Sequence, residues 1–400
     1  MFNNKFILIQ ITHHQKRKLS EKYRMLEKEE ILKIDKLNIS KDIYKLPDSI
    51  IQARNSCKSI DYPSIKQIIE SREFPNFPKC CIICGMGGSA ISGDILHDYL
   101  ANRVDFPIIT IRNYTLPKYV NENSLVFIIS YSGNTEETLH ALKESLERGA
   151  LIIAISSGGK LKEFCKKLQI PHILVPANLA PRAALGYLFT SLLITLQELG
   201  LIEPVDEEIT EMIEVLKILR DEISIKTPLE NNVAKQIALK CFNNIPVIYI
   251  NSQYKSVAKR YKTQINENSK TPCKIDFFPE LDHNEIVGWE CPIETSKKFI
   301  CLLLRTTDEI EAIKTRIELT KSIVLKEKLV DVIEIYARGE SKLSQIMSLI
   351  IIGDYISLYL AILNNKDPSP VESIVKLKNE LKNQLNLVQK IETDLFSKEE

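Results

Sequence analysis

Short apolar runs recur along the chain, and each is followed by a segment with the apolar spacing of an amphipathic helix. Such runs are typical of strands buried on both faces, and their alternation with helices predicts a parallel sheet covered on both sides. In the first half we predict strands over residues 80–84, 107–111, 125–129, 151–155 and 172–175. We predict helices that end near residues 102 and 148, one that begins near 160, and a long one over 181–200.

The same rhythm returns in the second half after a charged connector over residues 203–232, without evident repetition of the sequence. Here we predict strands over residues 247–250, 274–278, 298–304 and 330–335, and helices over 255–267, 309–324, 341–363 and finally 371–387. The predicted fold is therefore α/β, with two doubly wound parallel-sheet domains and a C-terminal helix. The expected limits are residues 1–35 for an N-terminal extension, 36–225 for the first domain and 226–390 for the second, including the C-terminal helix.

Charge and cysteine content narrow the class of protein. The 53 basic and 52 acidic side chains nearly cancel, so we expect no nucleic-acid partner, and a small anionic ligand must be held by a local site. The nine cysteines are irregularly spaced, and those between Cys80 and Cys84 are expected to be buried strand residues and not a metal site. Reduced thiols fit a cytoplasmic location. The N-terminal apolar stretch is too short for a signal sequence, and no window suggests a membrane span, so no membrane partner is expected.

Two polar loops follow predicted strands and have the chemistry to bind a phosphate group. Residues 85–89 are rich in glycine and stand at the start of a helix. Their backbone N–H groups, including those of Gly88 and Ser89, are therefore available to a ligand. The second loop, residues 130–135, supplies hydroxyl groups, from Ser130, Ser132 and Thr135. In open α/β sheets ligands bind beyond the carboxyl ends of strands, where these loops lie.

Two other interpretations of these loops stay open from the residues alone. Glycine-rich turns and hydroxyl caps are common before helices and need not bind anything. A dinucleotide fold is also conceivable, since Gly85, Gly87 and Ala90 satisfy G-x-G-x-x-A. However, no acidic residue follows the next strand, where Ile111 precedes Arg112, and the serine-rich second loop would be unexplained.

At residues 85–94 and 130–138 the sequence resembles the two phosphate loops of sugar-isomerase (SIS) domains, which are flavodoxin-like. In detail it resembles the archaeal-type bifunctional phosphoglucose/phosphomannose isomerases, over residues from about 36 to about 387. The resemblance implies two SIS domains, a hexose 6-phosphate substrate held by these loops, and no cofactor or metal. It also implies a homodimer.

The resemblance assigns roles to individual residues. Residues 260–270 resemble the helix end that bears the family's general base, which maps to Glu267, and residues 281–289 resemble its ring-opening histidine loop, which maps to His283. In the family this histidine reaches the active site of the neighbouring subunit. Without the resemblance, a glutamate at a helix end is usually a solvated charge and a lone loop histidine is usually a surface residue.

Two further motifs complete the expected site. Residues 181–187 resemble the family's arginine motif, so Arg182 is expected to stabilise the developing enediolate; its place in the first turn of an apolar helix is unfavourable for a cation, which itself suggests a ligand. Residues 367–376 resemble the C-terminal signature, in which Lys376 assists ring opening beside His283. Ser369 stands where the bifunctional enzymes usually carry threonine, and it is the expected determinant of substrate specificity.

These assignments predict an aldose–ketose isomerase, an intramolecular oxidoreductase that interconverts glucose 6-phosphate and mannose 6-phosphate with fructose 6-phosphate. Proton transfer would pass through a cis-enediol without a metal, and the six histidines show no spacing of a ligand cluster. One alternative is an isomerase restricted to glucose 6-phosphate. Another is a SIS-domain regulator that binds a sugar phosphate without turnover.

Overall fold

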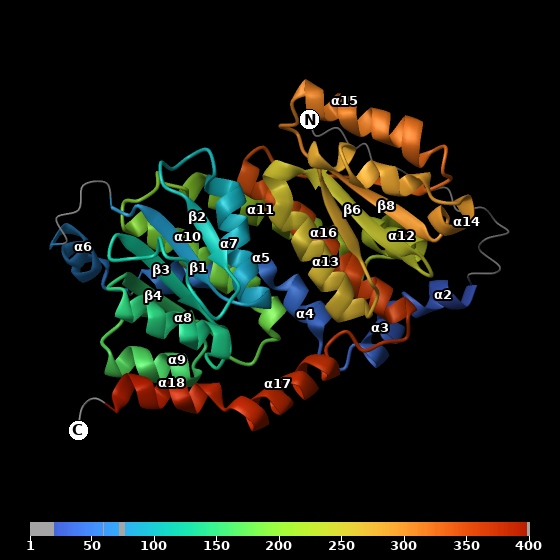
Figure 1. Ribbon diagram of the computed structural model, residues 1–400. Coiled ribbons are helices and arrows are strands. Elements are labelled where there is room, and N and C mark those ends of the chain that lie inside the picture. Colours follow the sequence, from blue (N-terminus) through green and yellow to red (C-terminus); the bar gives the residue numbers. More distant parts are fainter. Residues whose placement is uncertain (1–19, 59, 72–76, 398–400) are drawn as a thin grey trace.

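The computed structural model describes residues 20–58, 60–71 and 77–397, and in these the chain forms two parallel β-sheets that flank a layer of helices (Figure 1). The first sheet has the strand order β2-β1-β3-β4-β5. Its strands are β1 (Cys80–Cys84), β2 (Ile108–Ile111), β3 (Ser124–Ile129), β4 (Leu151–Ser156) and β5 (His172–Leu174). All neighbouring pairs are parallel, as the sequence predicted.

The second sheet repeats the topology of the first with one strand fewer. Its order is β7-β6-β8-β9, and all of its pairs are parallel. The strands are β6 (Ile245–Asn251), β7 (Lys274–Phe278), β8 (Phe299–Arg305) and β9 (Asp331–Tyr336). In each sheet the first strand along the chain lies inside the sheet, and the strands that follow it are added first on one side and then on the other. The topological switch points therefore lie between β1 and β3 and between β6 and β8. The two doubly wound parallel-sheet domains predicted from the sequence are thus confirmed.

Alternate residues of the strands enter different cores, which is why the apolar runs are continuous. In β1, Cys81 and Ile83 pack in a large core shared by both sheets, whereas Ile82 and Cys84 pack on the opposite face. In the second sheet Ile248 joins the same shared core, and its neighbours in β6 pack on a third core. Both sheets are therefore covered on both faces, and the core between them is shared by the two domains.

Each sheet is accompanied by its own set of helices. Those that accompany the first sheet are α7 (Gly87–Leu100), α8 (Glu136–Glu147), α9 (Gly159–Lys167) and α10 (Leu185–Glu198). The charged connector contains α11 (Asp206–Ile223), and the helices that accompany the second sheet are α12 (Val233–Cys241), α13 (Lys255–Ser269), α14 (Ile293–Ser296), α15 (Glu311–Leu319) and α16 (Lys342–Leu363). Short 3₁₀ segments are Pro181–Ala184, Leu229–Asn231, Ser252–Tyr254, Glu280–Asp282 and Glu285–Glu290, and Thr320–Leu325 forms a π-helix.

Helix α16 corrects one expectation from the sequence. We expected no window that suggests a membrane span, yet among the described residues this helix is long and apolar enough to cross a membrane. All of its most apolar window is buried inside the protein, where α16 packs against α11, α12 and α13. The uniform apolar composition therefore reflects a helix surrounded on all sides by other elements.

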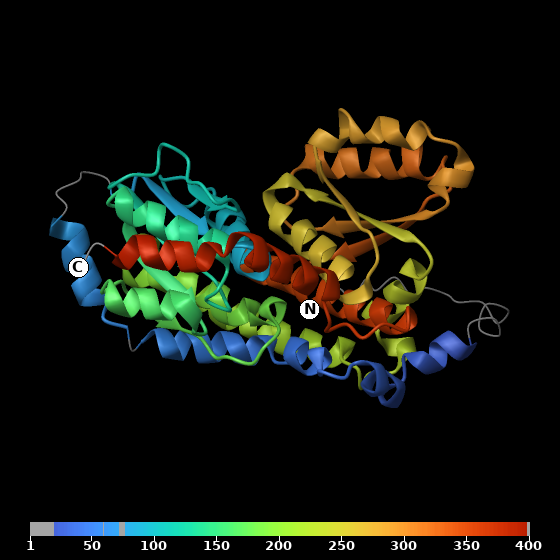
Figure 2. The ribbon, with the colours of Figure 1, turned by 60° about the horizontal axis from the view of Figure 1, so that its bottom comes forward.

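The charged connector was also underestimated, because residues 206–223 within it form α11. Its buried positions include Ile209, Met212 and Leu216, which recur at helical spacing and face α16. Many exposed charges on the opposite face concealed this stripe. The predicted N-terminal extension lies partly outside the described residues. Its remainder forms α2 (Ser20–Met25) and α3 (Lys28–Ile34), which with α4 (Ile39–Tyr44), α5 (Leu46–Cys57) and α6 (Tyr62–Ser71) follow one side of the molecule (Figure 2).

The C-terminal segment forms two helices where one was predicted. Helix α17 (Glu372–Leu385) ends at Asn386, whose left-handed backbone (φ 45°) turns the chain into α18 (Leu387–Phe396). Asparagine tolerates this conformation better than most residues, which explains why the helix breaks there. Helix α18 packs on α8 and buries Ile391 in the outer core of the first sheet, whereas α17 buries no residue.

Candidate active site

The two predicted phosphate loops lie side by side at the switch point of the first sheet. Strands β1 and β3 are neighbours, and their last paired residues are Cys84 and Ile128. The loop after β1 leads into α7, and the loop after β3 leads into α8. A hydrogen bond joins them, because the backbone N–H of Tyr131 donates to Ser89 Oγ at 3.1 Å. The structure therefore brings the two loops together at the N-termini of two long helices, which favour anions.

The hydroxyl groups of the second loop differ in their surroundings. Ser130 is buried, and its Oγ donates to Thr135 Oγ1 at 2.9 Å, so these two side chains brace the loop from within. Ser132 is exposed, and its Oγ accepts from the N–H of Asn134 at 3.3 Å. Gly133 has a φ of 69°, and a Cβ there would lie 1.8 Å from the carbonyl oxygen of Gly158. Glycine at this position is thus required both by the backbone and by the close approach of the next loop.

Gly88 connects the phosphate loops to the predicted catalytic arginine. A Cβ on Gly88 would lie 2.8 Å from the carbonyl oxygen of Pro181 and 3.1 Å from Cα of Arg182. The start of α7 therefore packs directly on the 3₁₀ turn that carries Arg182. A side chain at position 88 would separate the two, so the glycine-rich sequence sets the distance between the phosphate loops and the arginine.

Arg182 is the centre of the site. Its side chain is 5% exposed and donates through Nε to Asn268 Oδ1 at 2.7 Å and through Nη2 to the carbonyl oxygens of Pro368 and Ser369, at 2.7 and 3.0 Å. Its Nη1 lies 3.6 Å from Oε2 of Glu267, the predicted general base. Burial lowers the pKa of Arg182, and the charge of Glu267 opposes that effect. Three residues predicted from distant parts of the sequence, Arg182, Glu267 and Ser369, thus meet at one place.

A closed ring of hydrogen bonds holds Arg182, and most of its members were missed by the sequence analysis. Asn268 Nδ2 donates to Ser357 Oγ at 2.9 Å, and Ser357 donates to the carbonyl oxygen of Asp354 at 2.7 Å. The carboxylate of Asp354 accepts from Nε and Nη2 of Arg260, at 2.9 and 2.7 Å, and Arg260 Nη2 also donates to the carbonyl oxygen of Arg182 at 2.8 Å. Charged residues on the apolar α16 and on the buried face of α13 were the available signal.

Ser369 and Lys270 complete the wall around Glu267. The Oγ of Ser369 is buried and has no hydrogen-bond partner within the described chain. An unpaired hydroxyl at this depth is costly, and it is available to accept a hydrogen bond from a ligand or to donate one to it. Lys270, also missed from the sequence, donates to the carbonyl oxygens of Glu267 and of Pro370, the latter at 2.8 Å. Its pKa is lowered by burial and by the nearby charge of Arg182.

An open cleft of about 770 Å³ gives access to this site. Glu267 and Lys270 line one side of it, and the start of α17, from Val371 to Ile374, lines another. The side chain of Glu267 is 27% exposed, so a ligand in the cleft can reach its carboxylate. The volume is of the size that small-molecule ligands occupy.

Two predicted residues are not brought to Glu267 within one chain. His283 follows the turn after β7 and is exposed, and Lys376 is exposed on α17. Within the described residues no hydrogen bond or ion pair joins either side chain to Glu267 or Arg182. Elsewhere in the described chain, no three His, Cys, Asp or Glu side chains gather as a metal site would require.

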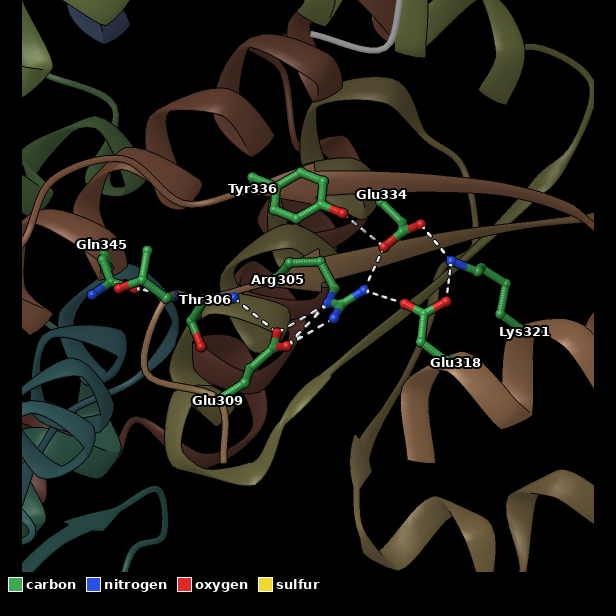
Figure 3. A network of polar contacts seen from close by, with 9 residues as sticks. Arg305, Thr306, Glu309, Glu318, Lys321, Glu334, Tyr336 and Gln345 are labelled. Carbon is green, nitrogen blue, oxygen red and sulfur yellow. Dashed lines mark hydrogen bonds and ion pairs between the residues drawn. The ribbon is translucent and has the colours of Figure 1, made fainter. Parts of the chain in front are cut away.

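The second domain places different chemistry at its own switch point. Strand β8 ends at Arg305, whose guanidinium is buried among the carboxylates of Glu309, Glu318 and Glu334 (Figure 3). Glu309 also accepts from the backbone N–H of Thr306 at 2.9 Å, where an anion would otherwise bind. Carboxylates of the protein itself therefore occupy this position.

The comparisons with known proteins agree with this geometry. Residues 78–166 match the SIS domain, and residues 230–381 match the C-terminal SIS domain of bacterial phospho-glucose isomerase. The chain is 43% identical over 340 residues to a bifunctional phosphoglucose/phosphomannose isomerase of Caldicellulosiruptor bescii, covering 85% of this chain and 97% of that one. It is 30% identical over 305 residues to a D-glucosamine-6-phosphate 4-epimerase of Sulfolobus acidocaldarius, covering 75% and 89% of the two chains.

A solved structure confirms the fold over nearly the whole length. The crystal structure of a hypothetical protein from Thermus thermophilus superposes with a TM-score of 0.69 at 14% identity, over 93% of this chain and 95% of that one. The fold, the two matched SIS domains and the extent of the sequence identity lead to one conclusion. The chain belongs to the family of bifunctional phosphoglucose/phosphomannose isomerases.

Proposed function

We propose that this protein isomerises hexose 6-phosphates, interconverting glucose 6-phosphate and mannose 6-phosphate with fructose 6-phosphate. The observation that carries the proposal is the meeting of Arg182, Glu267 and the unpaired hydroxyl of Ser369 beside the phosphate loop at Gly88. The activity is that of an isomerase and not of an oxidoreductase that exchanges electrons with a second molecule.

The chemistry follows from the positions of these groups. In the open-chain aldose, the carboxylate of Glu267 removes the proton from C2, and the electrons of that C–H bond form the C1–C2 double bond. The carbonyl oxygen at C1 gains negative charge, which the guanidinium of Arg182 stabilises. The proton of the C2 hydroxyl moves to O1, and the electrons left on O2 form the C2 carbonyl while Glu267 returns its proton to C1, giving the ketose. The ring of hydrogen bonds keeps Arg182 in place throughout, so little reorganisation is needed.

Ring opening must precede this transfer, and His283 and Lys376 are proposed to catalyse it. Both side chains are exposed in the single chain and stand apart from Glu267. We therefore also propose that the protein acts as a homodimer in which His283 reaches the site of the partner subunit. A two-fold axis would complete both sites at once.

A cytoplasmic location is part of the proposal. The nine cysteines all carry free thiols, and eight of them are buried. Burial raises the pKa of Cys84 and Cys165 to about 12, so these thiols stay protonated and unreactive. A reducing compartment suits such a chain.

The test is the formation of fructose 6-phosphate from glucose 6-phosphate and, separately, from mannose 6-phosphate, each with excess EDTA. Turnover of both is the expected result and would show that Ser369 serves in place of threonine. Turnover of glucose 6-phosphate alone would restrict the specificity. Binding of both without turnover would contradict the proposal in favour of a regulator. D-glucosamine 6-phosphate belongs in the same assay, because the Sulfolobus relative is named for an activity on it.

A further inference from the structure

Helix α17 is attached to the rest of the protein at both ends, and none of its residues is buried. Before it, the carbonyl oxygens of Pro368 and Pro370 accept hydrogen bonds from Arg182 and Lys270 at the catalytic cleft. After it, α18 is anchored on the first domain by the buried Ile391. Figure 1 shows α17 spanning the interval between these two attachments. This 14-residue helix buries no residue, so its own packing adds little stability.

A second cleft separates α17 from the phosphate loop. Its volume is about 520 Å³, and Asn134 and Thr135 of that loop line one wall. The opposite wall is formed by α17, with Lys378 and Lys382 among the lining residues. These two lysines are four positions apart and so project from the same face of the helix. The structure thus places two lysines across a cleft from Asn134 and Thr135, the end of the second phosphate loop; the other predicted phosphate-binding residues do not line this cleft.

Positively charged side chains near the phosphate loop would favour the binding of a phosphate dianion there. The loop offers hydroxyl and N–H donors but no positive side chain, and the first turn of α8 carries Glu136 and Glu137, which also line the cleft. Two carboxylates at this position oppose the binding of a phosphate dianion. Lys160 lines the cleft as well, but it is already paired with Glu163 and Glu392, at 3.0 and 3.1 Å.

Lys378 and Lys382 are the remaining cations of this cleft. Both are exposed, and the ammonium group of neither forms a hydrogen bond or ion pair in the part of the chain that the structure describes. Extended lysine side chains can cross a cleft of this size, and each contributes a point charge with three donors. Lys376 on the same helix lines neither this cleft nor the catalytic one, so the three lysines of α17 have different surroundings.

We infer that Lys378 and Lys382 form a cationic wall for the 6-phosphate group and bind the phosphate dianion of the substrate from the side opposite the loop. This inference rests on the proposed function, since it assigns residues to the same substrate. The two lysines act in binding, before and after the proton transfer alike, so they change KM and leave kcat nearly unaffected.

The experiment compares the double variant Lys378→Gln/Lys382→Gln with Lys390→Gln, which removes an exposed charge of α18 that lines neither cleft. We expect KM for fructose 6-phosphate and the inhibition constant of inorganic phosphate each to rise roughly tenfold in the double variant, with kcat within twofold. Lys390→Gln should behave as the wild type. The conservative variant Lys378→Arg/Lys382→Arg should recover most of the affinity, because it restores both charges.

Unchanged KM and phosphate inhibition in the double variant would overturn the inference while leaving the isomerase proposal intact. So would a fall in kcat alone, which would place the lysines in the chemistry instead. If the wild type turned over no hexose phosphate, the proposed function would fail. Binding of inorganic phosphate, followed by thermal shift, would then still decide whether the two lysines hold an anion. Circular dichroism confirms folding, and no core contact is at stake because α17 buries no residue.

Discussion

Glu267 is the residue on which turnover should depend most. Its carboxylate lies 3.6 Å from the guanidinium of Arg182 and borders the cleft, so it can both contact the substrate and be held by the arginine. Glu267→Gln keeps the size and the hydrogen-bonding capacity of the side chain but removes its basicity. We expect kcat to fall by a factor of about 10²–10⁴ while inorganic phosphate binds as in the wild type.

Single-turnover kinetics and competition with inorganic phosphate measure the two quantities separately. Glu380→Gln, an equal change of charge on the exposed face of α17, is the matched control and should leave kcat unchanged. A loss of phosphate affinity in Glu267→Gln as large as its loss of kcat would count against the role of general base.

Ser369 should separate activity from stability. Its Oγ is buried without a partner, so Ser369→Ala removes a polar group that gains nothing from the folded chain. We expect a melting temperature equal to or above that of the wild type, together with a loss of kcat/KM of about tenfold where the hydroxyl contacts the sugar. Differential scanning calorimetry and the isomerase assay on both aldoses check the two effects. A destabilised variant with normal kcat/KM would show that the hydroxyl serves the fold instead.

At the scale of elements, the strands and the loops that follow them could be predicted from the sequence. Strands β1, β3 and β4 are buried along their whole length and have unbroken apolar sequences, and parallel topology then places the loops that follow strands at one edge of the sheet. Helix α11 was hidden because its buried stripe is interrupted by charges, and the break at Asn386 depends on one residue in a left-handed conformation.

The hydrogen-bond ring could not be predicted for a different reason. Arg182, Arg260 and Asp354 are separated by tens of residues, and their pairing exists only after α13 and α16 have packed together. Charged residues inside apolar helices indicate that partners exist but do not say which. In contrast, Arg182, Glu267 and Ser369 were identified by resemblance because each lies within a short motif of the sequence.

Helices α7 and α13 connect the phosphate loop to the general base, and their contact should depend on pH. Asp98 of α7 is buried and accepts from the N–H of Ser256, at the start of α13, at 2.6 Å. Burial raises its pKa from 3.8 to about 6, against the opposing effects of the hydrogen bonds from Ser256 and of the charges of His97 and Lys342. Between these two pH values the folded protein holds a proton that the unfolded chain has released.

The free energy of unfolding should therefore fall through this window as the pH rises, by at most about 1.4 kcal/mol per pH unit. Asp98→Asn has no such proton. The melting temperature of the variant minus that of the wild type should therefore increase from pH 4 to pH 6 and stay constant at higher pH. Thermal unfolding at a series of pH values measures this, with the exposed Asp105→Asn as control. A difference that does not vary with pH would contradict the assigned cause.

At the scale of the whole molecule, one chain brings Glu267 and Arg182 together but leaves His283 on an exposed loop of the second sheet. If the histidine acts in the partner's site, Glu267→Gln inactivates the site of its own subunit, whereas His283→Ala inactivates the site of the partner subunit. In a dimer with one copy of each variant, the subunit with intact Glu267 receives the intact histidine from its partner. One functional site is thereby restored, and random reassortment of the two variants should return about a quarter of the wild-type activity.

The measurement mixes the two purified variants after reversible dissociation, with each variant treated alone as control. Recovery near a quarter would establish that the site is shared between subunits, because a histidine acting within its own chain leaves every mixed dimer with two defective sites. No recovery in mixtures that contain heterodimers, detected by differently tagged chains, would contradict the shared site. Either outcome shows whether His283 acts in the site of its own subunit or in that of its partner, because the samples differ only in how the two kinds of chain are paired.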